Sequence, residues 1–159
     1  MDYKKNIKEN RYWMTNFTRS FTNGSSPEEI LTASDKVKEV TAKDIQDVAA
    51  KYTQALNAKN IETPFVKNDR TSAWAQYSIR VQNRTELQTK LQNLGIPTAV
   101  HYPMPLHVQE CFKYLNLKEG DFPISEKVSK EIMSLPMNPY VSDEEIEFIV
   151  GSLAKELKC

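Results

Sequence analysis

The chain has 159 residues, of which 40% are hydrophobic and 26% are charged, so its composition is that of a globular protein and not of a disordered one. Its 21 basic residues equal its 21 acidic residues in number. This zero net charge argues against nucleic acid and against an anionic membrane surface as partners. No stretch reaches the roughly 18 consecutive apolar residues of a membrane span, and the lysine-rich N-terminus lacks the apolar region of a secretory signal.

The only cysteines are Cys111 and Cys159, which at this spacing form neither a metal-binding motif nor a disulfide framework. Reduced thiols are the simpler interpretation of two such residues. With no secretory signal in the sequence, they predict a cytoplasmic protein.

The first fifty or so residues have the pattern of successive helices. Apolar residues at helical spacing, followed by Asn23-Gly24, predict one helix. The run Ser26-Pro27-Glu28-Glu29 predicts the start of another, since it offers a capping serine, a proline for the first helical position and a glutamate that completes a capping box. A third helix is expected to start at Thr41, with an apolar stripe formed by Ile45, Val48, Ala49, Tyr52 and Leu56.

The pattern then changes to alternating apolar and polar residues over positions 73–81, which is the period of a half-buried strand. A helix is expected to open at Asn83 and to end at Gly95. Residues 98–102 predict a second strand. The inner face of the first strand is expected to consist of Ala73, Ala75, Tyr77, Ile79 and Val81.

Three more helices are expected after the second strand. A short one covers residues 108–115, another carries Ile132 and ends before Pro136, and the last opens with a capping box from Ser142 to Glu145. The predicted fold class is therefore α+β: a helical N-terminal third, followed by a small, mainly antiparallel sheet covered by helices.

The candidate site is the stretch from His101 to His107, which contains both histidines of the chain, the phenol of Tyr102 and two prolines. Prolines stiffen a loop, and a stiff loop after a strand can bind an anionic or hydroxyl-rich ligand. The alternative is that His101 and Tyr102 only close the strand end, and that His107 caps a turn or faces solvent.

Other kinds of site lack their motifs. The sequence has no His-Glu-x-x-His motif, no cysteine pair beside the histidines and no glycine-rich phosphate loop. Nothing in the sequence places a lysine in a desolvating pocket where it could form a Schiff base. We therefore predict no catalytic, cofactor-binding or metal-binding residue.

Several strings from residue 48 onward resemble a known family. They include the run Ser72 to Val81, the run Leu94-Gly95-Ile96-Pro97-Thr98-Ala99-Val100-His101-Tyr102-Pro103, and Ser134-Leu135-Pro136-Met137-Asn138-Pro139-Tyr140. In order along the chain, these strings are similar to the C-terminal part of the DegT/DnrJ/EryC1/StrS sugar aminotransferases.

The resemblance implies an enzyme that moves an amino group to a nucleotide-linked keto-sugar with pyridoxal phosphate. It also implies that His101, Tyr102 and His107 face the nucleotide-sugar side of the active site. The domain that carries the Schiff-base lysine and the phosphate-binding residues of the family has no counterpart in this sequence. Since the cofactor carries the hard chemistry, we expect no cofactor in this chain and no transamination by it.

The N-terminal third resembles a different family. Lys8-Glu9-Asn10-Arg11-Tyr12-Trp13, the run Pro27 to Leu31 and the run Val37 to Gln46 are similar to the tail of an M16 (insulinase-like) zinc peptidase. The zinc motif of that family, His-x-x-Glu-His, is absent. The two resemblances together imply a chimera with a helical domain at 1–50 and an aminotransferase-like α+β domain at 51–159.

Three functions are consistent with these observations. The first is a non-catalytic chimera. The second is an aminotransferase fragment that still binds a nucleotide sugar weakly or complements a separate large domain. The third is a self-associating module, because apolar surface normally covered by a large domain invites homo-oligomers.

Overall fold

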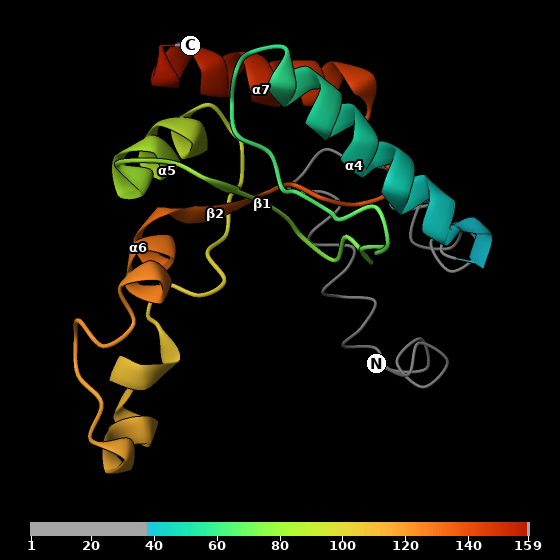
Figure 1. Ribbon diagram of the computed structural model, residues 1–159. Helices are drawn as coiled ribbons and strands as arrows, with labels where there is room; N and C mark the ends of the chain where they lie inside the picture. The colour runs from blue at the N-terminus through green and yellow to red at the C-terminus, as the bar shows by residue number, and fades with distance from the viewer. Residues whose placement is uncertain (1–37, 159) are drawn as a thin grey trace, which may run out of the picture. The chain divides into compact units, whose positions relative to one another are not determined.

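The helix expected from Thr41 onward is present as α4, Ala42–Asn57. The computed structural model describes residues 38–158 (Figure 1). The chain divides into two units, and everything from Ala42 onward belongs to the second. The two helices predicted before α4 lie outside the described residues, except for the last positions of the second. The description below concerns the second unit.

A two-stranded antiparallel sheet lies at the centre of this unit. Strand β1, Tyr77–Arg80, pairs with β2, Ile132–Leu135, with Tyr77 opposite Leu135. On its other edge β2 forms a single antiparallel bridge to Ala99. The predicted class, α+β with a small antiparallel sheet and covering helices, is confirmed.

The strand prediction for residues 73–81 was too long. The strand begins at Tyr77 because Trp74 has a φ of 48°, in the left-handed region that extended backbone cannot include. Ala73 and Ala75 are exposed and are not part of the inner face. From Tyr77 to Val81 the predicted alternation holds.

The second strand was assigned to the wrong residues. The run 98–102 makes only the bridge at Ala99, and the partner of β1 is β2, which lies in the run predicted as the end of a helix through Ile132. That helix, α6, spans Pro123–Glu131 and so ends before Ile132 and well before Pro136. A buried four-residue strand is too short to show the alternating pattern of a strand. Its first apolar residue, Ile132, instead continues the helical spacing of the residues in α6.

Helix α5, Arg84–Asn93, ends as predicted at a glycine. Gly95 has a φ of +78°. The Gly95 N–H donates to the Gln92 carbonyl at 2.9 Å and the Ile96 N–H donates to the Leu91 carbonyl at 2.9 Å, which together form a Schellman motif. At the start of α5, Asn83 precedes the helix in a left-handed conformation, and its side chain makes no capping hydrogen bond.

The last three helical elements are partly as expected. The short helix predicted at 108–115 is replaced by two 3₁₀ turns, η1 at Leu106–Val108 and η2 at Glu110–Leu115. Helix α7 spans Asp143–Leu157 and begins with the predicted capping box. Within the part of the chain that the structure describes, no helix is long and apolar enough to cross a bilayer.

The core lies between one face of the sheet and the helices α4, α5 and α7. Figure 1 shows α4 and α7 running side by side over the sheet, with α5 next to them. Tyr52 of α4 is fully buried, stacks on Tyr77 at 5.1 Å between ring centroids and donates its hydroxyl hydrogen to the Pro136 carbonyl at 2.9 Å. The largest fully buried side chains are Tyr52, Tyr77, Leu56, Ile79, Leu91, Met133 and Leu153.

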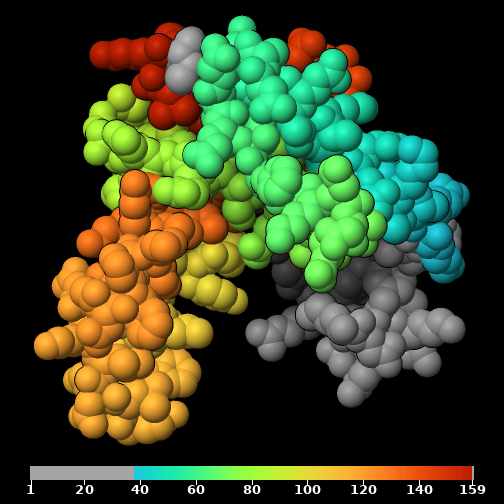
Figure 2. All heavy atoms as spheres, viewed as in Figure 1, coloured from blue at the N-terminus to red at the C-terminus, as the bar shows by residue number. Residues whose placement is uncertain are grey.

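Residues 103–131, which comprise η1, η2 and α6, form an extension that we call the arm. In Figure 2 the arm, coloured yellow to orange, stands apart from α4 and α7. Two arginines attach its end to the rest of the unit. Arg80 forms an ion pair with Glu131 at 2.6 Å, and Arg84 donates from Nη1 to the carbonyls of Ser129 and Ile132. Arg84 thereby caps the C-terminal end of α6.

The capping box of α7 gives the first testable prediction. The Glu145 N–H donates to the Ser142 hydroxyl at 3.2 Å, and the Ser142 N–H donates to the Glu145 carboxylate at 2.8 Å. We expect Ser142→Ala to lower the free energy of unfolding by about 1 kcal/mol, measured by urea denaturation, because the helix N-terminus loses its cap. Ser142→Thr keeps a capping hydroxyl and should retain most of the stability. Equal losses in both variants would contradict this account.

Candidate functional site

The outer face of the sheet, opposite the core, leads to the predicted site residues. Ser78 and Arg80 of β1 alternate with the buried core residues and so share this face with Ser134 and Ile132 of β2, which are their partners in register. The loop after the Ala99 bridge places His101 beside Ser134. The site is therefore built on the only regular sheet of the described residues.

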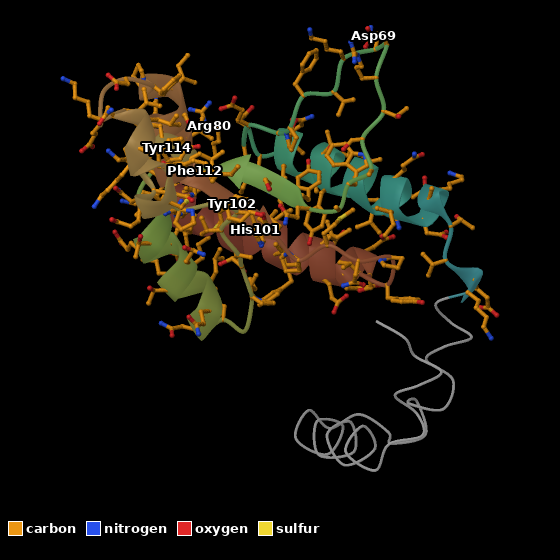
Figure 3. All side chains as sticks on the ribbon, turned by 90° about the horizontal axis from the view of Figure 1, so that it is seen from below. Asp69, Arg80, His101, Tyr102, Phe112 and Tyr114 are labelled. Carbon is orange, nitrogen blue, oxygen red and sulfur yellow. The ribbon has the colours of Figure 1, made fainter. Side chains whose placement is uncertain are left out.

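The side chains of His101 and Tyr102 lie close together. Their rings are 5.9 Å apart between centroids and nearly perpendicular, and both residues are exposed. Figure 3 shows the two side chains next to each other, whereas Asp69 lies at the tip of the loop that joins α4 to β1. An imidazole and a phenol side by side offer hydrogen-bond donors and acceptors to one ligand.

A cavity of about 640 Å³ opens next to these two residues, between the loop 101–106 and the first turns of α6. Most of its wall is apolar, and polar groups are few: His101, Tyr102, Asp121 and two serines of α6. A concave apolar wall with a few polar groups at its rim is typical of a site for a small organic molecule. Its main apolar side chains are Met104, Leu106, Phe122, Ile124, Val128 and Ile132.

His107 is placed differently from the other two. Its side chain is buried, its Nε2 lies 2.9 Å from Oε1 of Glu126, and its ring packs on Phe122 at 5.0 Å between centroids. It does not line the cavity. The structure thus brings His101 and Tyr102 together but gives His107 a contact inside the arm, and its role in substrate binding stays a prediction.

The carboxylate of Glu126 collects several donors within the arm. Besides facing His107, its Oε1 accepts from the Gly120 N–H at 2.8 Å and from the Phe122 N–H at 3.3 Å. Burial alone would raise the pKa of Glu126, but these hydrogen bonds and the neighbouring imidazole lower it below its ordinary value. Glu126 therefore ties η1 and the turn at Gly120 to the start of α6. Sequence reasoning missed it, although its place in the first turn of a predicted helix was a usable signal.

Ser134 was also missed. Its hydroxyl lies 3.4 Å from Nδ1 of His101, a long hydrogen bond, and 2.9 Å from the hydroxyl of Ser78. The alternation along β1 already placed Ser78 on the outer face. Its partner could not be found without β2, which the sequence pattern concealed.

The comparisons with known proteins identify the family. Residues 33–154 match the sequence model of the DegT/DnrJ/EryC1/StrS aminotransferase family. The chain belongs to this family. The match begins within the stretch that the sequence motifs assigned to a peptidase-like tail, so both descriptions cover residues 33–50. The domain boundary near residue 50 stays a prediction.

Two curated members of the family are similar to most of this chain. It is 40% identical over 108 residues to the UDP-2-acetamido-2-deoxy-3-oxo-D-glucuronate aminotransferase of Pseudomonas aeruginosa, with 68% of this chain and 29% of that protein covered. It is 35% identical over 108 residues to the dTDP-3-amino-3,6-dideoxy-alpha-D-galactopyranose transaminase of Aneurinibacillus thermoaerophilus, with the same two shares. The chain spans less than a third of the length of these relatives.

The structure of a DegT DnrJ EryC1 StrS aminotransferase from Brucella abortus has the same fold over this region. Its TM-score is 0.67 and its sequence identity 32%, and the match covers 83% of this chain and 34% of that one. The fold of the present unit is thus a part of the aminotransferase fold.

The described residues include no buried lysine that could hold the pyridoxal phosphate that the family resemblance implies. The cofactor needs a lysine amine in a desolvated pocket for its Schiff base. Every lysine between residues 38 and 158 is exposed. In the same part of the chain, no group of three or more His, Cys, Asp or Glu side chains is placed to hold a metal ion.

The Glu126 contacts predict an acid-dependent stability of the arm. A carboxyl group whose pKa is lowered on folding contributes stability above its unfolded pKa of about 4.3, and this contribution is lost as the pH falls through its folded pKa. We expect Glu126→Gln to be less stable than the wild type near neutral pH, with the difference shrinking below about pH 4. Urea unfolding at several pH values measures it.

A matched control exists on the same arm. Glu110 is 82% exposed in its side chain and pairs only with the exposed Lys113 among the ion pairs of the described chain. Glu110→Gln removes the same charge and should change stability little at any pH. A Glu126→Gln defect that is equally large at neutral and acid pH would show that the carboxylate charge is not what holds the arm.

Proposed function

We propose that this chain forms the C-terminal, substrate-side unit of a nucleotide-sugar aminotransferase and does not transaminate by itself. Membership of the aminotransferase family supports the reaction class. The names of the two curated relatives, one a UDP-sugar and the other a dTDP-sugar enzyme, support a nucleotide sugar as the substrate class. The observation that carries the second half of the proposal is that all lysines of the described residues are exposed.

In this proposal His101 and Tyr102 bind the polar part of the nucleotide sugar. Imidazole and phenol groups donate hydrogen bonds to phosphate oxygens, and they can both donate to and accept from sugar hydroxyls. The apolar wall formed by Met104, Leu106 and Ile124 would cover the carbon skeleton of the ligand. The cofactor would be held by residues other than those described. The two cysteines, interpreted as reduced thiols, support a cytoplasmic protein.

A cofactor-trapping experiment tests whether the chain has a Schiff-base site. The purified chain is incubated with pyridoxal phosphate, reduced with borohydride and digested for mass spectrometry. We expect weak labelling spread over many lysines, because no exposed amine has a desolvating pocket that would favour it over the others as the partner of the aldehyde. Free lysine in the same buffer is the control for this background reactivity.

Stoichiometric labelling of one lysine at low cofactor concentration would overturn the non-catalytic part of the proposal. Replacing that lysine by arginine would then have to abolish the adduct. Turnover of a nucleotide keto-sugar by the pure chain would overturn it as well.

The binding part of the proposal has a matched pair of tyrosines. Tyr102 and Tyr114 are both 73% exposed, but only Tyr102 lines the cavity. We expect Tyr102→Phe to weaken the binding of UDP-N-acetylglucosamine or dTDP-glucose about three- to tenfold, the effect of one lost hydrogen bond, measured by titration calorimetry. Tyr114→Phe should leave binding unchanged. Equal behaviour of the two variants would contradict a role of Tyr102.

A second candidate function follows from the apolar residues of the arm. Many of the large apolar side chains that the described unit exposes lie on it or at its base: Tyr102, Met104, Leu106, Tyr114, Leu115, Leu117, Phe122 and Ile124. Such a concentration is typical of a protein interface. The chain could therefore complement a separate large domain or associate with itself. Sedimentation at several concentrations separates these cases, because only self-association gives a mass that rises with concentration.

Only the sequence motifs of residues 1–50 support the proposal that the chain is a chimera. The chimeric origin adds no activity, since the motifs that resemble M16 peptidases do not include the zinc-binding one.

A further inference from the structure

The outer face of the sheet carries two serines in direct register. Ser78 of β1 is the partner of Ser134 of β2, and their hydroxyl oxygens are 2.9 Å apart. Ser134 is only 4% exposed, and Ser78 is half-buried. A buried hydroxyl requires hydrogen-bond partners, and on this face they are another hydroxyl and a histidine.

Ser134 holds the loop of His101 in two ways. Its backbone N–H donates to the Ala99 carbonyl at 2.8 Å, and its carbonyl accepts from the Ala99 N–H at 3.1 Å. Its hydroxyl is 3.4 Å from Nδ1 of His101. The backbone bridge fixes where the loop begins, and the hydroxyl then contacts one particular nitrogen of the ring two residues further on.

We propose that Ser134, supported by Ser78, is a positioning residue that occupies Nδ1 of His101 and leaves Nε2 as the ring nitrogen that meets the ligand. This rests on the proposed function for the identity of the ligand, a phosphate or hydroxyl oxygen of a nucleotide sugar. Ser134 would influence ligand binding through His101 and would not touch the ligand itself.

Both directions of donation in the serine pair are compatible with this role. If Ser78 donates to Ser134, then Ser134 donates to Nδ1, and Nε2 carries the hydrogen of the neutral ring. If Nδ1–H donates to Ser134, then Ser134 donates to Ser78, and the neutral ring accepts at Nε2. In either case Nδ1 is the ring nitrogen that the serine contacts.

The titratable groups that share the cavity with His101 are Tyr102 and Asp121. Arg80, on the same face of β1, is engaged with Glu131. The Ser134 hydroxyl is thus a neutral and buried partner of the ring.

The chain is well suited to a direct test because it has only two histidines. The ring nitrogen signals of His101 and His107 can be followed by NMR at one neutral pH and assigned with the single variants His101→Gln and His107→Gln. We expect Ser134→Ala to change the ring nitrogen signals of His101, because Nδ1 loses its hydroxyl partner, and to leave those of His107 unchanged.

His107 serves as the internal control for folding, since it is held by Glu126 and not by the sheet. A shift confined to His101 supports the positioning role. No shift, or equal shifts of both histidines, overturns it, because the second result would report a general disturbance of the unit.

Two further variants keep the test decisive if Ser134→Ala is poorly folded. Ser78→Ala removes only the second hydroxyl of the pair and should change the ring nitrogen signals of His101 less than Ser134→Ala does. Ser134→Thr keeps a hydroxyl at the same position and should restore the wild-type ring signals of His101. A threonine variant that behaves like the alanine variant would argue that the hydroxyl is irrelevant.

The ligand part is measured separately with UDP-N-acetylglucosamine as the probe. We expect it to perturb the His101 ring signals of the wild type and to bind Ser134→Ala about three- to tenfold more weakly. If the probe perturbs nothing in the wild type, the proposed binding function fails, while the ring nitrogen signals measured without ligand still decide the positioning role. If binding is unchanged in Ser134→Ala, the positioning role fails while the binding function stands.

Discussion

The pairing of β1 with β2 is the contact on which the rest of this unit depends. A two-stranded sheet is marginal in water unless one face is covered, and here α4, α5 and α7 cover the face that carries Tyr77, Ile79 and Met133. The stacked rings of Tyr52 and Tyr77 join α4 to the sheet. Because side chains alternate along a strand, fixing this inner face also fixes which side chains point outward. The register of the β1–β2 pair thus determines both which residues enter the core and which residues face the candidate site.

The outer face shows how a small protein unit can place a histidine without a deep pocket. The Ala99 bridge and the Ser134 hydroxyl constrain the loop at neighbouring points, and the arm supplies the apolar wall on the other side. The arm in turn is held at its base by two arginines and internally by the carboxylate of Glu126. The contacts of Ser134, the two arginines and Glu126 are polar, whereas the stability of the core comes from apolar burial.

Sequence reasoning succeeded where an element was long or had a chemical start or stop signal. The stripe of α4, the capping box at Ser142 and the terminating Gly95 were all read correctly. It failed at β2, because a strand of only four residues shows no clear alternation. It also failed at Trp74, because the left-handed φ of this residue interrupts the strand although the apolar and polar residues continue to alternate. The sequence singles out His101 and Tyr102 as candidates through their residue types, and their role stays a prediction. Glu126 and Ser134 could not be singled out, because their contacts are with partners distant in the chain, 19 residues for the His107 contact and 33 for the His101 contact. Contacts of this kind require the fold to be known first.

The long separation of the paired strands has a consequence for how the unit assembles. Ser78 and Ser134 are 56 residues apart in the chain, so bringing β1 and β2 together closes a loop whose entropy costs on the order of 3–4 kcal/mol. Helices α4, α5 and α7 can start from local contacts, but the sheet cannot. Any ligand of the outer face therefore recognises a surface that exists only after this closure, and it stabilises the closed chain by mass action in proportion to the logarithm of its concentration.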